Sequence, residues 1–207
     1  MSNPDLEKKI LDEIGKTGFP LELRVSAWLQ NRGYFIANSV YYVDHDEDKG
    51  REVDLRALKN YEFKVEREQY YVRHYLLIEC KKSSNKPWVI FTSPITGYDK
   101  KLHQIDCRGF ADDAIWYFED GVESLQITHP FTAGKRRGRS YFEPFKNSET
   151  SEAIFKALTT SVKATIATRD SYYSGGHPNI CFYYPLVVFE GDLYEAYLEG
   201  NDVKLNN

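Results

Sequence analysis

A carboxylate and an ammonium group stand two residues apart at the end of an apolar run. Residues 70–82 are rich in aromatic and β-branched side chains, which predicts a buried strand. Because side chains alternate along a strand, Glu79 and Lys81 share one face, while Cys80 points the other way, toward the core. Burying two charged groups costs free energy unless they are paired or used. A Glu-x-Lys triplet alone is more often a surface ion pair, so its meaning depends on the rest of the chain.

Two further carboxylates precede this strand, each on its own element. Residues 51–58 alternate apolar and polar side chains, the pattern of a half-buried strand, with Asp54 on the polar face. Residues 20–31 are predicted to form a helix that Gly33 closes. Glu22 lies at the edge of its apolar stripe, so its carboxylate faces the rim of the core. Taken alone, this acid is explained better by a favourable interaction with the helix dipole. The stripe consists of Leu21, Val25, Trp28, Leu29 and Arg32.

Together these groups match the needs of phosphodiester hydrolysis. Two carboxylates at neighbouring strand ends can hold Mg²⁺ or Mn²⁺ together with water and a substrate phosphate. The backbone carbonyl of Cys80 is well placed as a further ligand. Lys81 would orient or help to deprotonate the attacking water, or stabilise negative charge on the phosphate.

This arrangement resembles the PD-(D/E)xK nuclease superfamily, which has the restriction-endonuclease-like fold. The family pattern is an acidic residue on a helix, an Asp on one strand and (Asp/Glu)-x-Lys on the next, and it corresponds to residues 18–90 here. Gly-Tyr-Phe after the helix and the run Ile-Glu-Cys-Lys-Lys-Ser at 78–83 look similar to the restriction-system and Holliday-junction-resolvase branches. Two departures are Val53, where the family has Pro, and the wide gap between Asp54 and Glu79.

The resemblance implies a set of functional residues and a reaction. Glu22, Asp54, Glu79 and Lys81 would be catalytic, and the metal ligands would be Asp54, Glu79, the Cys80 carbonyl and Glu22. The implied activity is that of a Mg²⁺-dependent endonuclease acting on DNA in restriction, phage defence or repair. The alternative is a module on the same fold that binds nucleic acid or protein without catalysis. A homodimer would suit the nuclease, because cutting both strands of a duplex often needs two sites.

The predicted fold is one α/β domain over residues 1–207, a central mixed β-sheet flanked by helices with an elaborated C-terminal part. Further helices are predicted at 5–14, 98–105, 110–116 and 149–168, and further strands at 34–43, 88–91, 179–189 and 194–198. The last long helix shows an apolar stripe of Ile154, Leu158, Val162 and Ile166. The acidic run 44–50 lacks the spacing of a calcium loop and is interpreted as a solvated hairpin tip.

Charge and cysteine content indicate which classes of binding partner and which cellular compartment to expect. The net charge of −4 argues against a protein that coats DNA with its whole surface, but a nuclease needs only a local basic groove. Candidate nucleic-acid contacts are Lys82 and the basic run Lys135, Arg136, Arg137 and Arg139, which is otherwise a solvated loop. Cys80, Cys107 and Cys181 have no metal-ligand spacing, which favours free thiols in a reducing, cytoplasmic compartment. No run is long enough to span a membrane, and Gln104 is a weaker site candidate.

Overall fold

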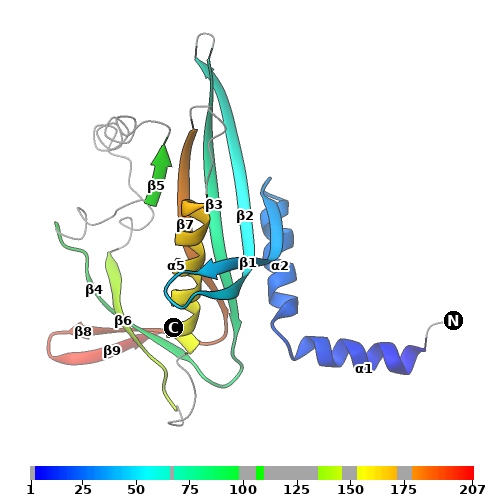
Figure 1. Cartoon of the computed structure of the whole chain (residues 1–207). Helices are drawn as coiled ribbons and strands as arrows, with labels where there is room; N and C mark the ends of the chain where they lie inside the picture. The colour runs from blue at the N-terminus through cyan, green and yellow to red at the C-terminus, as the bar shows by residue number, and fades with distance from the viewer. Residues whose placement is uncertain (1–2, 66–67, 98–105, 110–134, 146–152, 172–178) are drawn as a thin grey trace.

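The central sheet of the molecule is built from strands whose apolar residues alternate with polar ones. We describe a computed structural model, which defines residues 3–65, 68–97, 106–109, 135–145, 153–171 and 179–207. The sheet has the order β1-β2-β3-β7-β5 (Figure 1). Its strands are β1 Phe35–Asp44, β2 Lys49–Val65, β3 Glu68–Lys82, β5 Asp106–Gly109 and β7 Asn179–Glu190. β3 pairs antiparallel with β2 and parallel with β7, so the sheet is mixed.

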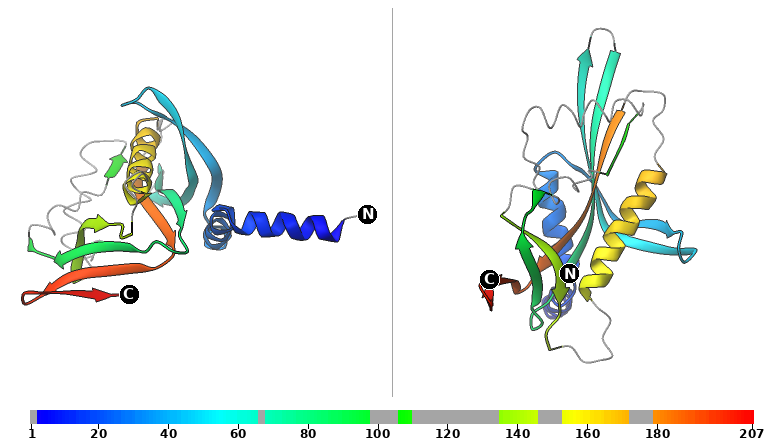
Figure 2. Two further views of the ribbon diagram at one scale, coloured as in Figure 1. Left: turned by 90° about the horizontal axis from the view of Figure 1, so that it is seen from below. Right: turned by 90° about the vertical axis from the view of Figure 1, so that its left-hand side faces the viewer.

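Two helices cover opposite faces of this sheet. They are α2, Phe19–Gln30, and α5, Ala153–Asp170 (Figure 2). Gly33 follows α2 with a φ of 79°, a left-handed conformation that glycine adopts without a steric penalty. With a third helix, α1, Pro4–Gly15, the described residues form a mixed α/β structure of three helices and two mixed sheets. The α/β class and the helices near 5–14 and 20–31 are therefore as the sequence indicates.

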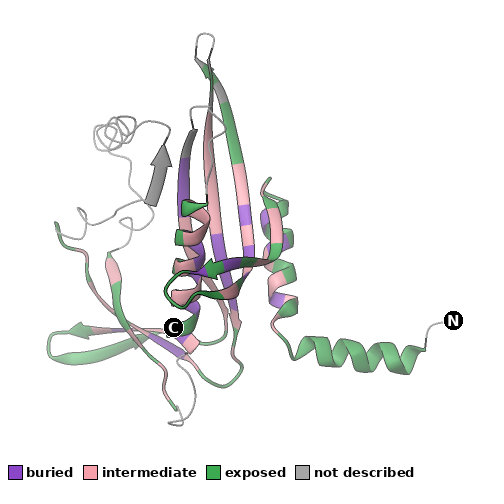
Figure 3. Cartoon of the chain, viewed as in Figure 1, coloured by how far each residue is buried: buried purple, intermediate pink, exposed green. Residues whose placement is uncertain are grey.

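The α2 face of the sheet holds the apolar core expected from the sequence. Leu21 and Leu29 of α2 are buried with the inward side chains of β2 and β3, which are Leu55, Ala57, Ile78 and Cys80. Figure 3 marks buried positions on these three elements in purple. Trp28 is an exception, because 55% of its surface is exposed and the Arg32 guanidinium lies 3.5 Å from its ring centre. The predicted stripe of α2 is therefore too wide, and its Trp28 edge lies outside the core.

The α5 face is packed differently from the prediction. The predicted stripe lies on the outside of α5, where Leu158, Val162 and Ile166 are exposed, and of its members only Ile154 is buried. The side chains that α5 buries against the sheet are mostly small, namely Ala157, Ser161, Ala164 and Thr165. Small residues let the helix backbone approach the sheet closely, which explains why the large apolar residues point away.

A second mixed sheet follows the central one and has the order β6-β4-β8-β9. Its strands are β4 Trp88–Pro94, β6 Arg136–Phe142, β8 Leu193–Glu199 and β9 Asp202–Asn206. The basic run 135–139 thus forms most of a strand, β6, and its interpretation as a loop is wrong. The helices predicted at 98–105 and 110–116 and the residue Gln104 lie outside the described residues.

Trp88 links the second sheet to the rest of the molecule. Its ring stacks on Phe189 of β7 with 4.1 Å between centroids, and it is buried with Ile154 and Ala157 of α5. The β2–β3 hairpin and α1 both extend away from the central body (Figure 1). No helix in the described part of the chain is long and apolar enough to cross a membrane.

Candidate active site

The site forms where two neighbouring strands separate. The ladder between β2 and β3 ends at the pair Leu55 and Ile78, and Asp54 and Glu79 are the next residues on each strand. Beyond this point the backbone N–H of Cys80 has no carbonyl partner on β2 and donates instead to Oδ2 of Asp54, at 2.7 Å. The Asp54 carboxylate therefore closes the gap between the strands and is held next to Glu79.

Lys81 joins the two carboxylates. Its Nζ lies 2.6 Å from Oε2 of Glu79 and 3.8 Å from Oδ2 of Asp54. Glu79 is buried, and the thiol side of Cys80 lies in the core on the opposite face of the strand. The alternation predicted for residues 79–81 is confirmed, and one ammonium group is within reach of both acids.

Burial and pairing shift the pKa values of this pair. Burial raises the pKa of Glu79, and the hydrogen bond and positive charge of Lys81 offset part of this rise. Burial by itself would lower the pKa of Lys81, but the hydrogen bond to Glu79 and the charges of Glu79 and Asp54 together raise it. Lys81 is therefore an ammonium ion at neutral pH in this state of the molecule, which suits stabilisation of negative charge better than proton abstraction.

Cys80 contributes its backbone to the site and its side chain to the core. Burial and the charge of Asp54 raise the pKa of its thiol to about 12, so that the sulfur stays protonated. The N–H and C=O groups of one strand residue point to the same edge of the strand. Because the Cys80 N–H points to Asp54, its carbonyl is directed toward the same edge, as a ligand role requires.

Glu22 lies in the electrostatic field of the same groups. It is in the first turn of α2 and is partly buried. Burial and the negative charge of Asp54 raise its pKa, and the positive charge of Lys81 acts in the opposite direction. Lys81 pairs with both Asp54 and Glu79, whereas Glu22 has no ion pair with these groups and does not line the pocket that they border.

A charged pocket opens at these residues. Its walls come from the first part of β2, the end of β3 and α5. They consist of Lys49, Gly50, Arg51, Glu52, Asp54, Glu79, Lys81, Lys156 and Thr160. The sequence identifies three of these, Asp54, Glu79 and Lys81. Arg51 and Lys156 were missed, since no spacing in the sequence shows that α5 packs beside the start of β2.

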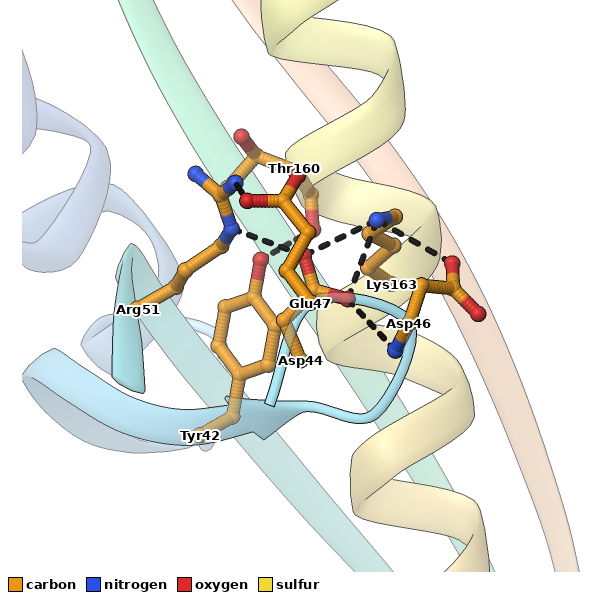
Figure 4. A network of polar contacts seen from close by, with 7 residues as sticks. All are labelled: Tyr42, Asp44, Asp46, Glu47, Arg51, Thr160 and Lys163. Atoms are coloured by element: carbon orange, nitrogen blue, oxygen red, sulfur yellow. Dashed lines mark hydrogen bonds and ion pairs between the residues drawn. The ribbon is translucent and has the colours of Figure 1, made fainter. Parts of the chain in front are cut away.

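A network of ion pairs ties the β1–β2 turn to α5 (Figure 4). Both oxygens of Asp44 accept hydrogen bonds from the Lys163 ammonium, at 3.0 and 2.8 Å. Arg51 donates from Nε to Asp44 at 2.7 Å, and its Nη2 pairs with Glu47 at 2.6 Å. The interpretation of residues 44–50 as a solvated tip is wrong for Asp44, which is buried because its partner Lys163 is distant in sequence but adjacent in space.

None of the predicted nucleic-acid contacts lines this pocket. Arg136 pairs with Glu195 at 3.3 Å and stacks on the ring of Tyr197, so the second sheet engages it internally. Arg139 donates to the Ser93 hydroxyl at 2.7 Å. Lys82 pairs with Glu190 at 3.5 Å and donates to the carbonyl of Gly15. Of the predicted set, Lys135 is exposed and directly precedes β6, and Arg137 lies within that strand.

Across the described part of the chain, no group of three or more His, Cys, Asp or Glu side chains is gathered closely enough to form a metal-binding cluster. At the candidate site, Asp54 and Glu79 share Lys81 as their partner. No protein-family model, curated protein or solved structure matches this chain.

Proposed function

We propose that this chain is a metal-dependent endonuclease of the PD-(D/E)xK type that hydrolyses phosphodiester bonds of DNA. The mixed central sheet with helices on both faces would be its restriction-endonuclease-like core. The observation that carries the proposal is the meeting of Asp54, Glu79 and Lys81 where β2 and β3 separate, at the wall of a charged pocket. Two acids and an ammonium group in contact are the groups that metal-assisted phosphodiester hydrolysis uses.

The available donors suit Mg²⁺ or Mn²⁺. Mg²⁺ in proteins is commonly held by one or two carboxylates, with water and substrate phosphate completing its shell. Asp54 and Glu79 would supply the carboxylate oxygens and Cys80 a backbone carbonyl, while Glu22 would act on the ion or on its water. When bound, the ion would lower the pKa of a water molecule and neutralise charge on the phosphate.

The protein's own groups would prepare the phosphate for attack. The Lys81 ammonium, held by Glu79, would stabilise the negative charge that develops on the phosphate oxygens. Asp54 is fixed by the Cys80 N–H, which orients its carboxylate before any ligand arrives. Such preorganisation avoids rearrangement of charged groups during the reaction.

A cleavage assay tests this proposal directly. Supercoiled plasmid is incubated with the protein in Mg²⁺ or Mn²⁺, and in EDTA as the metal-free control. We expect nicked or linear product only with metal, and a rate lower by at least about 100-fold in Asp54→Asn and in Lys81→Met. Asp202→Asn and Lys204→Met, on exposed positions of β9, serve as matched charge controls and should cut as the unaltered chain does. Cleavage that persists in both site variants would rule out this site.

One observation favours the alternative of a module without catalysis. Lys81 already occupies one oxygen of the buried Glu79, as a purely structural ion pair would. This alternative predicts salt-dependent binding to DNA with no metal-dependent product, and binding that is unchanged in Asp54→Asn.

A further inference from the structure

The pocket contains a second set of charged residues that the catalytic proposal does not use. Arg51 at the start of β2 and Lys156 on α5 line the same pocket as Asp54 and Glu79. The lining carries four cations, Lys49, Arg51, Lys81 and Lys156, against three carboxylates, Glu52, Asp54 and Glu79. Among the residues that line the pocket, positive charges therefore outnumber negative ones by one, in a chain whose net charge is −4.

The composition of the pocket also indicates the class of its ligand. None of its described lining residues has an apolar side chain, apart from the methyl group of Thr160. Sites for small organic ligands are lined mainly by apolar and aromatic groups. A pocket of charged side chains that places cations beside acids suits an anionic polymer backbone instead, because the cations offset the repulsion between phosphate and carboxylates.

Two carboxylates that do not line the pocket hold the Arg51 guanidinium in place. Its Nε and Nη2 are bound by Asp44 and Glu47, and in the described structure no contact engages its Nη1. A guanidinium has five N–H donors in a rigid plane, so these two contacts fix its orientation and leave donors for a ligand. Asp44 is in turn buried and bound by Lys163 through both oxygens (Figure 4).

We propose that Arg51 and Lys156 bind a phosphate of the DNA backbone next to the scissile one, and that Asp44 is a positioning residue that orients Arg51 for this contact. The identity of the ligand as nucleic acid rests on the proposed function. Arg suits this task because its planar fork matches phosphate oxygens, and Lys156 adds a flexible point charge from the opposite element. The buried acid on β1 thereby acts on substrate binding through the arginine.

Binding without metal tests the phosphate contact. The affinity of the full chain for a short DNA duplex is measured in EDTA over a series of salt concentrations. The logarithm of the affinity falls linearly with the logarithm of the salt concentration. Removing one contact between a cation and a phosphate should make this slope less steep by about 0.9. We expect this reduction, with about tenfold weaker binding, in Arg51→Ala and in Lys156→Ala. Lys8→Ala, on the exposed helix α1, removes the same charge and should leave slope and affinity unchanged. Slopes equal to that of the Lys8 variant, or no salt-dependent binding at all, would overturn the inference.

The role of Asp44 is tested by whether Asp44→Asn strengthens or weakens DNA binding. Asp44→Asn removes a negative charge, which by charge alone would strengthen DNA binding, whereas release of Arg51 should weaken it about tenfold. Asp46→Asn is the matched control, since Asp46 pairs with Lys163 but not with Arg51. In the Arg51→Ala background, Asp44→Asn should cause no further loss of affinity. Stronger or unchanged binding in Asp44→Asn, or an additional loss in the double variant, would contradict the positioning role.

A merely structural role of Asp44 would lower the melting temperature without changing the affinity of the folded variant for DNA. If Asp44→Asn does not fold, Arg51→Lys replaces it, since lysine keeps the charge but cannot reach both Asp44 and Glu47 with a planar fork. In Arg51→Lys, weaker binding with an unchanged slope supports the inference, and unchanged affinity contradicts it.

Binding and cleavage are measured separately, so that the two proposals can fail independently. A chain that binds as described but does not cut refutes the catalytic proposal alone, whereas one that cuts with unaltered binding in Arg51→Ala and Lys156→Ala refutes this inference alone.

Discussion

The buried Glu79 and the partly exposed Lys81 form a pair in which each charge depends on the other. Glu79 is almost fully enclosed, and Lys81 is its hydrogen-bond partner at 2.6 Å. Pairs of this kind contribute little net stability, but removing one partner leaves an uncompensated buried charge. The site is therefore sensitive to the loss of either group, even in the absence of any ligand.

Lys81→Met should lower the free energy of unfolding by about 1–3 kcal/mol, because the Glu79 carboxylate loses its partner. The double variant Glu79→Gln with Lys81→Met should recover part of this loss, since no buried charge is left unpaired. Urea denaturation followed by circular dichroism measures both. A double variant less stable than the single one would contradict this account of the pair.

Asp44 should make stability depend on pH. The hydrogen bond from Lys163, followed by those from Arg51 and the Asp46 N–H, lowers the pKa of Asp44 although burial acts against this. The folded state thus holds its proton less tightly than the unfolded state, whose aspartate pKa is about 3.9. The stabilisation is complete above that pH and is lost as the pH falls through the lowered pKa.

We expect the difference in melting temperature between the unaltered chain and Asp44→Asn to be constant from neutral pH down to about pH 5 and to shrink below pH 4. Thermal unfolding at intervals of pH gives this difference. Asp46→Asn, on the exposed partner of Lys163, should show a much smaller dependence. A difference that grows on acidification would mean that Asp44 is not the ionised acceptor.

At the scale of elements, the strands follow the sequence more closely than the helix faces do. Alternation of side chains predicts β2, β3 and the inward position of Cys80, because a strand with one buried face fixes which residues point inward. The apolar stripe of α5 led to the wrong face, since large residues mark the core only where the packing distance allows them. The sequence also cannot show that Lys163 reaches Asp44 or that Lys156 reaches the pocket, because both contacts depend on how α5 docks.

Close packing of α5 gives a test of this arrangement. Ala164→Leu should lower the free energy of unfolding by about 1–3 kcal/mol, because the added atoms have no room between helix and sheet. Val162→Ala, on the exposed side of the same helix, should change it by less than about 0.5 kcal/mol. Chemical denaturation compares the two. Similar effects at both positions would show that the helix packs with a different face.

At the scale of the whole molecule, the packed body differs from α1 in how far its apolar residues are buried. The body consists of the central sheet between α2 and α5, joined to the second sheet through Trp88. α1 has no buried residue, and its apolar side chains Leu6, Ile10, Leu11 and Ile14 are exposed (Figure 3). The amphipathic pattern of α1 therefore predicts its helix correctly, whereas nothing in the described chain covers its apolar side.

Leucine truncations separate the body from α1. Leu29→Ala in α2 should lower the free energy of unfolding by about 2–5 kcal/mol, since Leu29 is buried against β2 and β3. Leu11→Ala in α1 should change it by less than about 0.5 kcal/mol, because 66% of the Leu11 surface is exposed. Denaturation of the dilute protein measures both values. A large loss in Leu11→Ala would show that α1 is packed on a surface.

The Asp54 carboxylate, where β2 and β3 separate, also has a structural role. The backbone N–H of Cys80 donates to a side-chain oxygen of Asp54, where in a regular sheet it would donate to a backbone carbonyl. Asp54 therefore replaces one backbone hydrogen bond between the two strands. Asn has an acceptor oxygen at the same distance from the backbone as Asp and could take that place, whereas the acceptor oxygen of Ser or Thr is one bond closer to the backbone. A variant that loses the carboxylate but keeps an acceptor oxygen at residue 54 should therefore still join the two strands at this point.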